Sequence, residues 1–334
     1  MIPSVAGSTA IVTGAGSGKW NPGSVHLSRV GSSIIQYLPR LLGINLAFAS
    51  LLLSKGCNVI FADLSLRPEA ADVVSAYSTS SDHKARAIFQ QTDVTDWGQL
   101  SSLFALATSE FGGANIVCPG AGVYEPPMSS FWLPPESSPL SKDDPSQSRY
   151  KTLDINLTHP IRCTQLAIAH FLARPLRTAG VNRVLSRGTV VHISSIAAQV
   201  SPLFVPIYNA SKAGLSHFVR SLAPLEKQIG IRVNGVAPGL IKTPLWTEHP
   251  EKLKMINDDF DDWVSPEEVA EVMLNCVVQE ENVGGTILEI GKGQVRRVEV
   301  FGDRGPQGAG IDLPKASICD DDVWKLLGTS GWGI

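Results

Sequence analysis

Seven short apolar or β-branched runs recur along the chain, and helical patterns lie between them. The runs span residues 9–13, 58–62, 87–92, 116–119, 188–194, 232–237 and 286–290. Strands that alternate with helices pair in parallel and are joined by crossover helices. We therefore predict an α/β fold with a single doubly wound domain, a seven-stranded parallel sheet and helices on both faces. In such sheets ligands bind beyond the carboxyl ends of the strands, so the residues that follow each run are the candidates for chemistry.

Composition favours a globular protein with a small-molecule partner. Hydrophobic residues make up 43% of the 334 residues and charged residues 18%, as in ordinary globular domains. The net charge of -3 and the scattered Lys and Arg residues give no reason to expect nucleic acid or a membrane surface as partner. The five cysteines lack metal-ligand and redox-motif spacing, so we expect reduced thiols and no metal. With no secretory signal and no apolar run of about 20 residues, the chain is expected to be cytoplasmic.

A glycine-rich turn follows the first run. The stretch "TGAGSG" places Gly14, Gly16 and Gly18 where backbone N–H groups and the start of the next helix can meet a pyrophosphate. Taken alone, such a turn is equally compatible with a structural loop. Asp63 ends the second run, where a carboxylate accepts hydrogen bonds from ribose hydroxyls and repels a 2'-phosphate. Together they predict a Rossmann-type domain over residues 1–293 that binds NAD, with NADP as the less favoured cofactor.

The distance between these two features is unusual. About 20 residues are expected between glycine turn and acidic residue, yet Gly18 and Asp63 are 45 positions apart. Removing residues 19–43 restores a separation of 20 and joins the turn to the amphipathic pattern "INLAFASLLLSKG". We interpret 19–43 as a translated intron or gene-model error, because Gly18-Lys19-Trp20 can be encoded by GGT AAG TGG, which contains the splice-donor sequence GTAAGT. A genuine surface loop is the alternative, since the entropy of loop closure grows slowly with length.

Two further segments fall outside the alternation of strands and helices. Residues 124–150 are rich in Pro and Ser and follow the fourth run, so we expect a long loop at the active-site end of the sheet. Residues 294–334 form the expected C-terminal tail. Neither segment has a pattern that identifies a ligand.

The candidate catalytic residues are a serine, a tyrosine and a lysine. Tyr208 and Lys212 are four apart in "YNASKAGLSHFVRSLA", so they lie on one face of the predicted helix. A tyrosine pKa near 10 is high for a base, and a nearby ammonium group lowers it, which allows Tyr208 to remove a hydroxyl proton. Two exposed helix residues without a catalytic role would show the same spacing. Ser195, at the end of the buried run "VVHISS", adds a hydroxyl that can hold a carbonyl oxygen or an alkoxide.

From about residue 8 to residue 293 the chain resembles the short-chain dehydrogenase/reductase family. The supporting motifs include "LDINLTHPIR", "DVTD" and "APGLIKTPLW". The family's catalytic residues match Asn156, Ser195, Tyr208 and Lys212, with the asparagine holding a water beside the lysine. The family's cofactor-binding positions match Gly14, Ser17, Gly18, Ile44, Asp63, Asp93, Tyr208, Lys212, Ile241 and Thr243.

The resemblance implies an NAD(P)-dependent oxidoreductase that interconverts a secondary alcohol and a ketone. Within the family, segments such as "GKGQVRRVEVF" are similar to fungal proteins related to NAD-dependent hydroxyprostaglandin dehydrogenase, which implies a small lipid-like or secondary-metabolite substrate. The family commonly forms homodimers or homotetramers. The alternative is a catalytically silent dinucleotide-binding or regulatory protein with an interrupted phosphate turn.

Three departures from the family pattern stand out. The family's Asn-Asn-Ala-Gly after the fourth strand is here Pro119-Gly120-Ala121-Gly122, so an asparagine that braces the strands is missing. The last glycine of the family's turn is Asn45. The glutamine usual before the tyrosine in prostaglandin dehydrogenases has no match in "VSPLFVPIY", which counts against a prostaglandin substrate.

Overall fold

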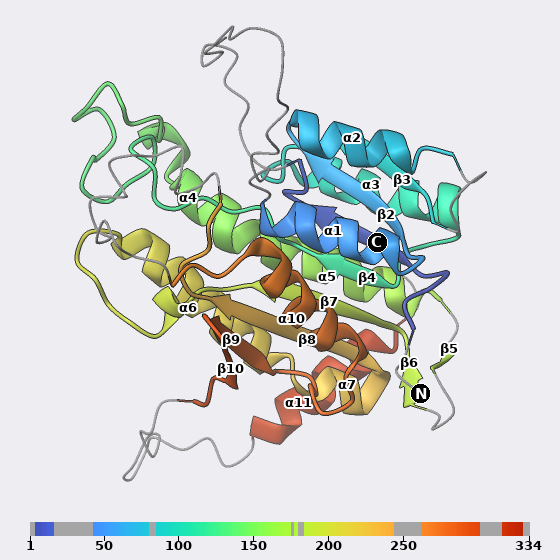
Figure 1. Cartoon of the computed structure of the whole chain (residues 1–334). Coiled ribbons are helices and arrows are strands. Elements are labelled where there is room, and N and C mark those ends of the chain that lie inside the picture. Colours follow the sequence, from blue (N-terminus) through green and yellow to red (C-terminus); the bar gives the residue numbers. More distant parts are fainter. Residues whose placement is uncertain are drawn as a thin grey trace, which may run out of the picture.

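One mostly parallel sheet forms the centre of the molecule (Figure 1). The computed structural model describes residues 4–16, 43–79, 85–174, 177–179, 184–243, 262–300 and 316–329. The strand order is β10-β9-β8-β7-β4-β1-β2-β3. The strands are β1 Thr9–Thr13, β2 Asn58–Asp63, β3 Ala87–Gln91, β4 Ile116–Cys118, β7 Gly188–Ile193, β8 Ile231–Pro238, β9 Ile287–Gly291 and β10 Gln294–Arg297. The seven predicted strands all form and pair in parallel, so the predicted fold class is confirmed.

The structure adds strands that the sequence patterns did not indicate. β10 turns back at Gly293, where φ is +68°, and pairs antiparallel with β9. All four of its residues are exposed, so "QVRR" carries no apolar run. A separate antiparallel pair, β5 Arg177–Ala179 and β6 Val184–Ser186, has only three residues in each strand. Short or exposed strands leave too little periodicity for a sequence pattern to detect.

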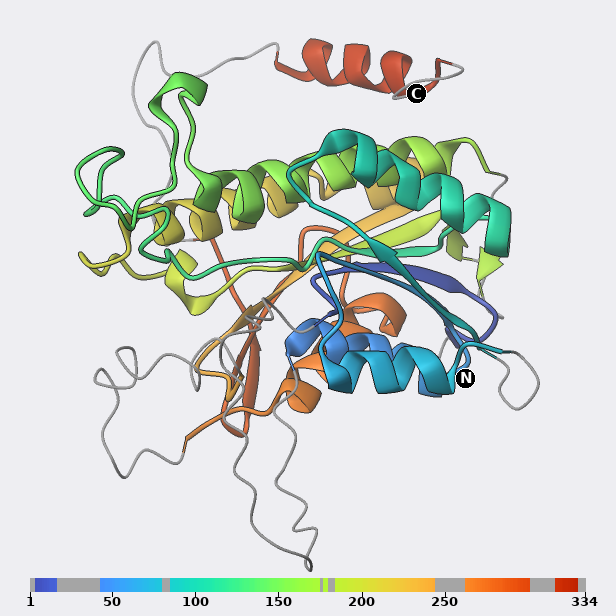
Figure 2. The ribbon, with the colours of Figure 1, turned by 90° about the horizontal axis from the view of Figure 1, so that it is seen from above.

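Helices cover both faces of the sheet (Figure 2). One face packs against α1, α2 and α10, and its core includes Phe48 and Leu52. The other face carries α3, α5, α6 and smaller helices, and its core includes Leu103 and Phe171. The helices are α1 Ile44–Ser54, α2 Pro68–Ala76, α3 Trp97–Phe111, α4 Lys151–Leu153, α5 His159–Leu172, α6 Pro206–Ser221, α7 Pro224–Ile229, α10 Pro266–Val278 and α11 Ala316–Leu327, with 3-10 turns at Pro145–Gln147 and Ile196–Ala198 and a π-helix at Asp154–Thr158.

Local sequence signals account for several helix ends. Asp96 caps α3 by accepting hydrogen bonds from the backbone N–H groups of Gly98 and Gln99. Ser265 and Glu268 form a reciprocal capping box at the start of α10. α3 ends at Gly112, whose φ of +70° is in the left-handed region that glycine adopts without strain. Within the described ranges, every helix is too short or too polar to cross a membrane.

Candidate active site

Ser195, Tyr208 and Lys212 come together at the carboxyl end of β7. Ser195 lies two residues beyond the strand, and Tyr208 is the third residue of α6. The Ser195 and Tyr208 side chains are hydrogen-bonded, and the Lys212 Nζ lies 5.7 Å from the centre of the Tyr208 ring. Lys212 Nζ donates to the Ile193 carbonyl at 2.8 Å, which holds the ammonium group against the end of β7. The structure therefore joins the three residues that the sequence suggested as catalytic.

The acid–base character of this group differs from the sequence expectation. Burial raises the pKa of Tyr208 to about 12, although the hydrogen bond from Ser195 lowers it and Tyr124 raises it further. Burial also lowers the pKa of Lys212 to about 8. Lys212 Nζ lies over the Tyr208 ring and donates to the Ile193 carbonyl. Loss of solvation therefore has the largest effect on the pKa of Tyr208. In this state Tyr208 is a protonated hydroxyl, which can donate to a carbonyl oxygen.

Asn156 braces this corner from a π-helical segment. Its Oδ1 accepts from the Val123 N–H at 2.9 Å, and its Nδ2 donates to the Val123 carbonyl at 2.8 Å and to Ser211 Oγ at 3.3 Å. Ser211 Oγ in turn donates to the Tyr208 carbonyl at 2.6 Å. π-helical turns are frequent at functional sites because they displace one residue from the regular helix surface. Here the displaced turn lets Asn156 join the segment after β4 to α6.

Two described pieces surround the predicted phosphate site. Gly14 has a φ of +75° and donates its N–H to the Ala62 carbonyl at 2.7 Å. The Gly16 N–H donates to Asp63 Oδ2 at 2.9 Å, and a Cβ on Gly16 would lie 2.1 Å from the Ser65 carbonyl oxygen. The backbone therefore turns tightly against Asp63, as a dinucleotide site requires. Ser17, Gly18 and residues 19–42 of the predicted insertion lie outside the described residues.

The second piece is the start of α1. Gly43 is its N-cap, which has no side chain of its own to cap the helix, and Ile44 is its first residue. The N–H groups of a first helical turn and the helix dipole favour an anion at such an end. The glycine turn and Asp63 thus fit the pyrophosphate and ribose of a dinucleotide.

Asn45 and Gly120 explain two departures from the family pattern together. Asn45 Nδ2 donates to the Gly120 carbonyl at 2.9 Å. A Cβ on Gly120 would lie only 2.0 Å from Asn45 Oδ1. The amide of Asn45 therefore occupies the space beside Gly120, where the family has an asparagine side chain. The bracing amide is present in this chain but comes from α1.

The remaining predicted cofactor residues also lie at the carboxyl edge of the sheet. Asp93, just beyond β3, accepts from the Thr95 N–H at 2.9 Å and from Thr95 Oγ1 at 2.7 Å. Ile241 follows β8, forms a β-bridge with Val264 and is 4% exposed, and Thr243 is also buried. These positions are compatible with the predicted adenine and nicotinamide ends of the cofactor.

The Pro/Ser-rich loop is ordered against the active-site helices. Ser129 accepts two hydrogen bonds from Thr152, one from its N–H to Oγ at 2.9 Å and one from its Oγ1 to the carbonyl at 2.8 Å, and Trp132 Nε1 donates to the Leu203 carbonyl at 2.9 Å. Figures 1 and 2 both place this loop beside the start of α6. Its Glu125 and Tyr124 contact Tyr208, and sequence reasoning missed both because the partners are more than 80 residues apart. No sequence spacing signals such a contact.

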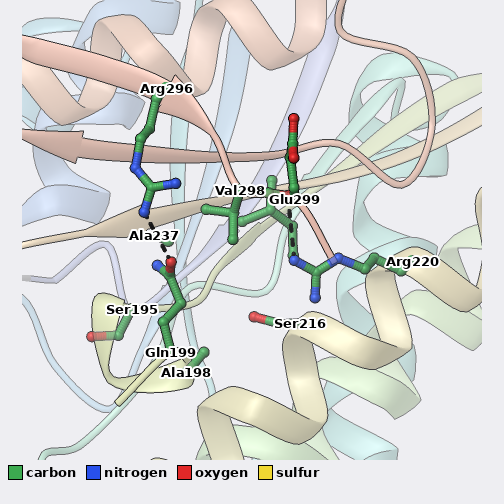
Figure 3. A pocket seen from close by; sticks show the side chains of 10 residues that line it. Ser195, Ala198, Gln199, Ser216, Arg220, Ala237, Arg296, Val298 and Glu299 are labelled. Atoms are coloured by element: carbon green, nitrogen blue, oxygen red, sulfur yellow. Dashed lines mark hydrogen bonds between the residues drawn. The ribbon is translucent and has the colours of Figure 1, made fainter. Parts of the chain in front are cut away.

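A cavity of about 130 Å³ lies behind Ser195, between α6 and the strands β8 to β10 (Figure 3). Arg220, Ser216 and Gln199 line it, and Arg296 donates to Gln199 Oε1 at 3.2 Å. In Figure 3 the Ser195 hydroxyl points away from the other lining side chains. The cavity therefore lies on the side of Ser195 that faces away from its hydroxyl.

A half-buried tyrosine beside a buried lysine, next to a glycine turn that fits a dinucleotide, is the arrangement of oxidoreductases that move a hydride to or from an alcohol carbon. The family model described as short chain dehydrogenase matches residues 41–254. The chain belongs to this family. It is an oxidoreductase of CH–OH groups and the corresponding carbonyls that uses a nicotinamide dinucleotide.

Several curated proteins are similar to the chain. Cis-4-hydroxycyclohexanecarboxylate dehydrogenase of Sinomonas cyclohexanicum is 32% identical over 234 residues, covering 69% of this chain and 83% of that protein. The short-chain dehydrogenase/reductase prx6 of Penicillium rubens is 28% identical over 254 residues, 76% of this chain and 74% of its own. The 15-hydroxyprostaglandin dehydrogenase [NAD(+)] of Rattus norvegicus is 26% identical over 262 residues, 74% of this chain and 86% of its own.

Proposed function

We propose that the protein interconverts a secondary alcohol and a ketone on a small lipid-like or secondary-metabolite substrate, with NAD as the favoured cofactor. The observation that carries this proposal is the meeting of Ser195, Tyr208 and Lys212 around one tyrosine hydroxyl. The bound cofactor supplies or accepts the hydride. Tyr208 gives a proton to the carbonyl oxygen in reduction and takes it back in oxidation.

The other residues support this proton transfer. Ser195 holds the substrate oxygen by a hydrogen bond that strengthens as negative charge develops there. The Lys212 ammonium group favours the tyrosinate that forms in reduction. Asn156 keeps α6 and the segment after β4 in register. It also lies near Lys212, as the family's water-holding asparagine does: a Cβ on Gly122 would be 3.4 Å from Asn156 Oδ1 and 3.8 Å from Lys212 Nζ.

The preference for NAD rests on Asp63. Its carboxylate lies at the end of β2 against the glycine turn, where it accepts hydrogen bonds from Gly16 and Leu64. A negative charge at this place repels the 2'-phosphate of NADP, and a carboxylate there accepts hydrogen bonds from ribose hydroxyls. The NAD-named relatives support the same preference.

An apolar rim supports a lipid-like substrate. Two loops that flank the start of α6 carry large apolar side chains that are at least half exposed: Phe131, Trp132, Leu203 and Phe204. The Trp132 indole bonds to the Leu203 carbonyl, which ties the two loops together. Exposed apolar side chains gathered beside a site favour an apolar ligand over a highly charged one.

Turnover on a panel of ketones tests the proposed function. Purified protein is mixed with NADH and cyclic, aliphatic and sterol-like ketones, and the loss of nicotinamide absorbance is followed. We expect oxidation of NADH with at least one apolar ketone, and turnover lower by about 10²- to 10⁴-fold with Tyr208→Phe, which retains NADH binding. Equal turnover by wild type and Tyr208→Phe refutes the assignment of the acid–base residue.

The alternative function, a catalytically silent binding or regulatory protein, is tested by comparing chains with and without residues 19–43. The family match begins at residue 41, which supports the interpretation of this segment as an insertion. NADH is titrated into the 334-residue chain and into a chain lacking residues 19–43. Binding by the shorter form alone indicates an enzyme with an interrupted turn. Binding by both forms without turnover on the panel supports a silent binding protein.

We further propose a homodimer or homotetramer that pairs through the helices near Asn156 and Tyr208. Sedimentation equilibrium of the full chain measures this directly, and a monomer at micromolar concentration contradicts it.

A further inference from the structure

Glu125 is a buried carboxylate in an unusual backbone conformation. Glu125 is only 7% exposed, and its φ of +32° lies in the left-handed region. A buried carboxylate is costly unless hydrogen bonds replace its water. A non-glycine residue keeps a strained backbone only where surrounding contacts hold it there, and such residues cluster at functional sites. The contacts of Glu125 identify what holds it.

One carboxylate oxygen reaches the first turn of α6. Glu125 Oε2 accepts from the Tyr208 N–H at 2.9 Å. α6 begins after Val205, which offers no side-chain acceptor, so the helix lacks a cap of its own. The first N–H groups of a helix need acceptors from outside, and a negative charge there is favoured by the helix dipole. Glu125 supplies both from a segment 83 residues earlier.

The other carboxylate oxygen holds the Pro/Ser-rich loop. Glu125 Oε1 accepts from the Phe131 N–H at 3.0 Å and from Ser130 Oγ at 3.3 Å. The neighbouring Tyr124 ring packs edge-on against the Tyr208 ring, with centres 4.7 Å apart. One side chain therefore connects the apolar rim to the backbone of the residue whose hydroxyl does the proposed chemistry.

We infer that Glu125 is a positioning residue: it caps the catalytic helix from outside and fixes Tyr208 against Ser195 while it anchors the loop that carries Phe131. This inference rests on the proposed function for its effect on turnover. The structural contact itself, a protected Tyr208 N–H, is independent of any reaction. A displacement of about 1 Å in a reacting group can lower a rate by about 100-fold, so a small shift of Tyr208 has a large effect.

The test compares Glu125→Ala, Glu125→Gln and a matched control, Glu136→Ala. Glu136 lies in the same loop and also has a positive φ, of +66°, but it is exposed. We expect Glu125→Ala to lower kcat roughly 10- to 100-fold while the Kd for NADH changes less than about twofold. Glu125→Gln keeps one acceptor oxygen for the Tyr208 N–H and should recover part of kcat. Glu136→Ala should match wild type.

Hydrogen–deuterium exchange of the first turn of α6 is measured on the same proteins. Faster exchange in Glu125→Ala, partly restored in Glu125→Gln, supports the cap even if the ketone panel yields no substrate. Unchanged exchange and unchanged kcat in a folded Glu125→Ala overturn the inference. If Glu125→Ala does not fold, Glu125→Gln decides: wild-type exchange at Tyr208 with kcat within twofold of wild type means that the carboxylate does not position the tyrosine.

Discussion

The catalytic corner and the phosphate turn lie at the same edge of the sheet but are assembled differently. Ser195, Tyr208 and Lys212 lie within one strand end and one helix, so eighteen consecutive residues contain them. The phosphate turn joins residues 14–16 to residues 43–45, which are far apart in the chain. Each of its halves has its own anchor: Gly14 bonds to the end of β2, and Asn45 bonds to the turn after β4.

The difference shows how each region tolerates change. Neighbouring strands hold the two halves of the phosphate turn, so the sheet core keeps them in place without a short link between them. In the catalytic corner, burial is the main cause of the shifted pKa values of Tyr208 and Lys212, and the reacting groups are single side chains, so single substitutions act directly on the chemistry. We therefore expect single substitutions to lower activity most in the catalytic corner. For the phosphate turn, we expect paired substitutions to show which residues of its two halves contact each other.

The largest effect is expected for Tyr208→Phe. Removing the hydroxyl removes the proposed general acid, which contributes about 10²- to 10⁴-fold to a rate. We expect kcat for ketone reduction to fall by this amount, while NADH fluorescence titration gives an unchanged Kd. Tyr150→Phe, in an exposed to half-buried part of the long loop, is the control and should keep full activity. A loss of NADH binding in Tyr208→Phe contradicts the separation of the two regions.

Lys212 predicts a pH dependence of stability. Burial lowers its pKa from 10.5 to about 8, so between these values the unfolded chain holds a proton that the folded chain has released. The free energy of unfolding from this residue therefore rises with pH across that window, by up to about 3 kcal/mol. Urea denaturation of wild type and Lys212→Met at pH 7.5 and pH 10 should show wild type gaining stability relative to the variant. The exposed Lys55→Met serves as control, and equal changes in all three proteins contradict the buried charge.

The pair Asn45 and Gly120 tests the phosphate turn. Gly120→Asn should destabilise the protein because its Cβ would lie 2.0 Å from Asn45 Oδ1, and Asn45→Gly should lose the bond to the Gly120 carbonyl. The double variant moves the amide from position 45 to position 120. It should recover stability, with a coupling energy of about 1–3 kcal/mol. Unfolding free energies of the four proteins measure this coupling. Additive effects would show that the two residues do not share one space.

The smallest effect is expected for Asp63→Asn. The amide keeps an acceptor for the Gly16 N–H but loses the charge, so repulsion of a 2'-phosphate falls. We expect the ratio of NADPH to NADH affinity to rise roughly tenfold, or about 1.4 kcal/mol. Paired titrations with both cofactors measure it. An unchanged ratio means that another residue selects the cofactor.

Sequence patterns predicted the features that depend on local periodicity. The seven parallel strands were found because most of them are largely buried and read as apolar runs, whereas exposed β10 has no such signal. Tyr208 and Lys212 were found because helical spacing places them together. The raised pKa of Tyr208 was not, since it depends on burial by surrounding segments.

Contacts between distant segments were beyond sequence reasoning. The missing asparagine at position 120 and the unexpected asparagine at position 45 were each visible as departures. Only the packing of α1 against the turn after β4 shows that one replaces the other. Glu125 lies in a segment with no regular pattern, and its role depends on a carboxylate that spans two loops.

The eighth strand has a consequence for self-association. An exposed strand at the edge of a sheet offers unpaired backbone groups to another chain, and charged side chains there discourage such pairing. β10 carries Arg296 and Arg297, with Arg296 bonded to Glu289 across the hairpin. A second copy that added a strand at this edge would have to accommodate these guanidinium groups beside its own. We therefore expect copies of the protein to associate through helices, with each sheet ending at its own β10.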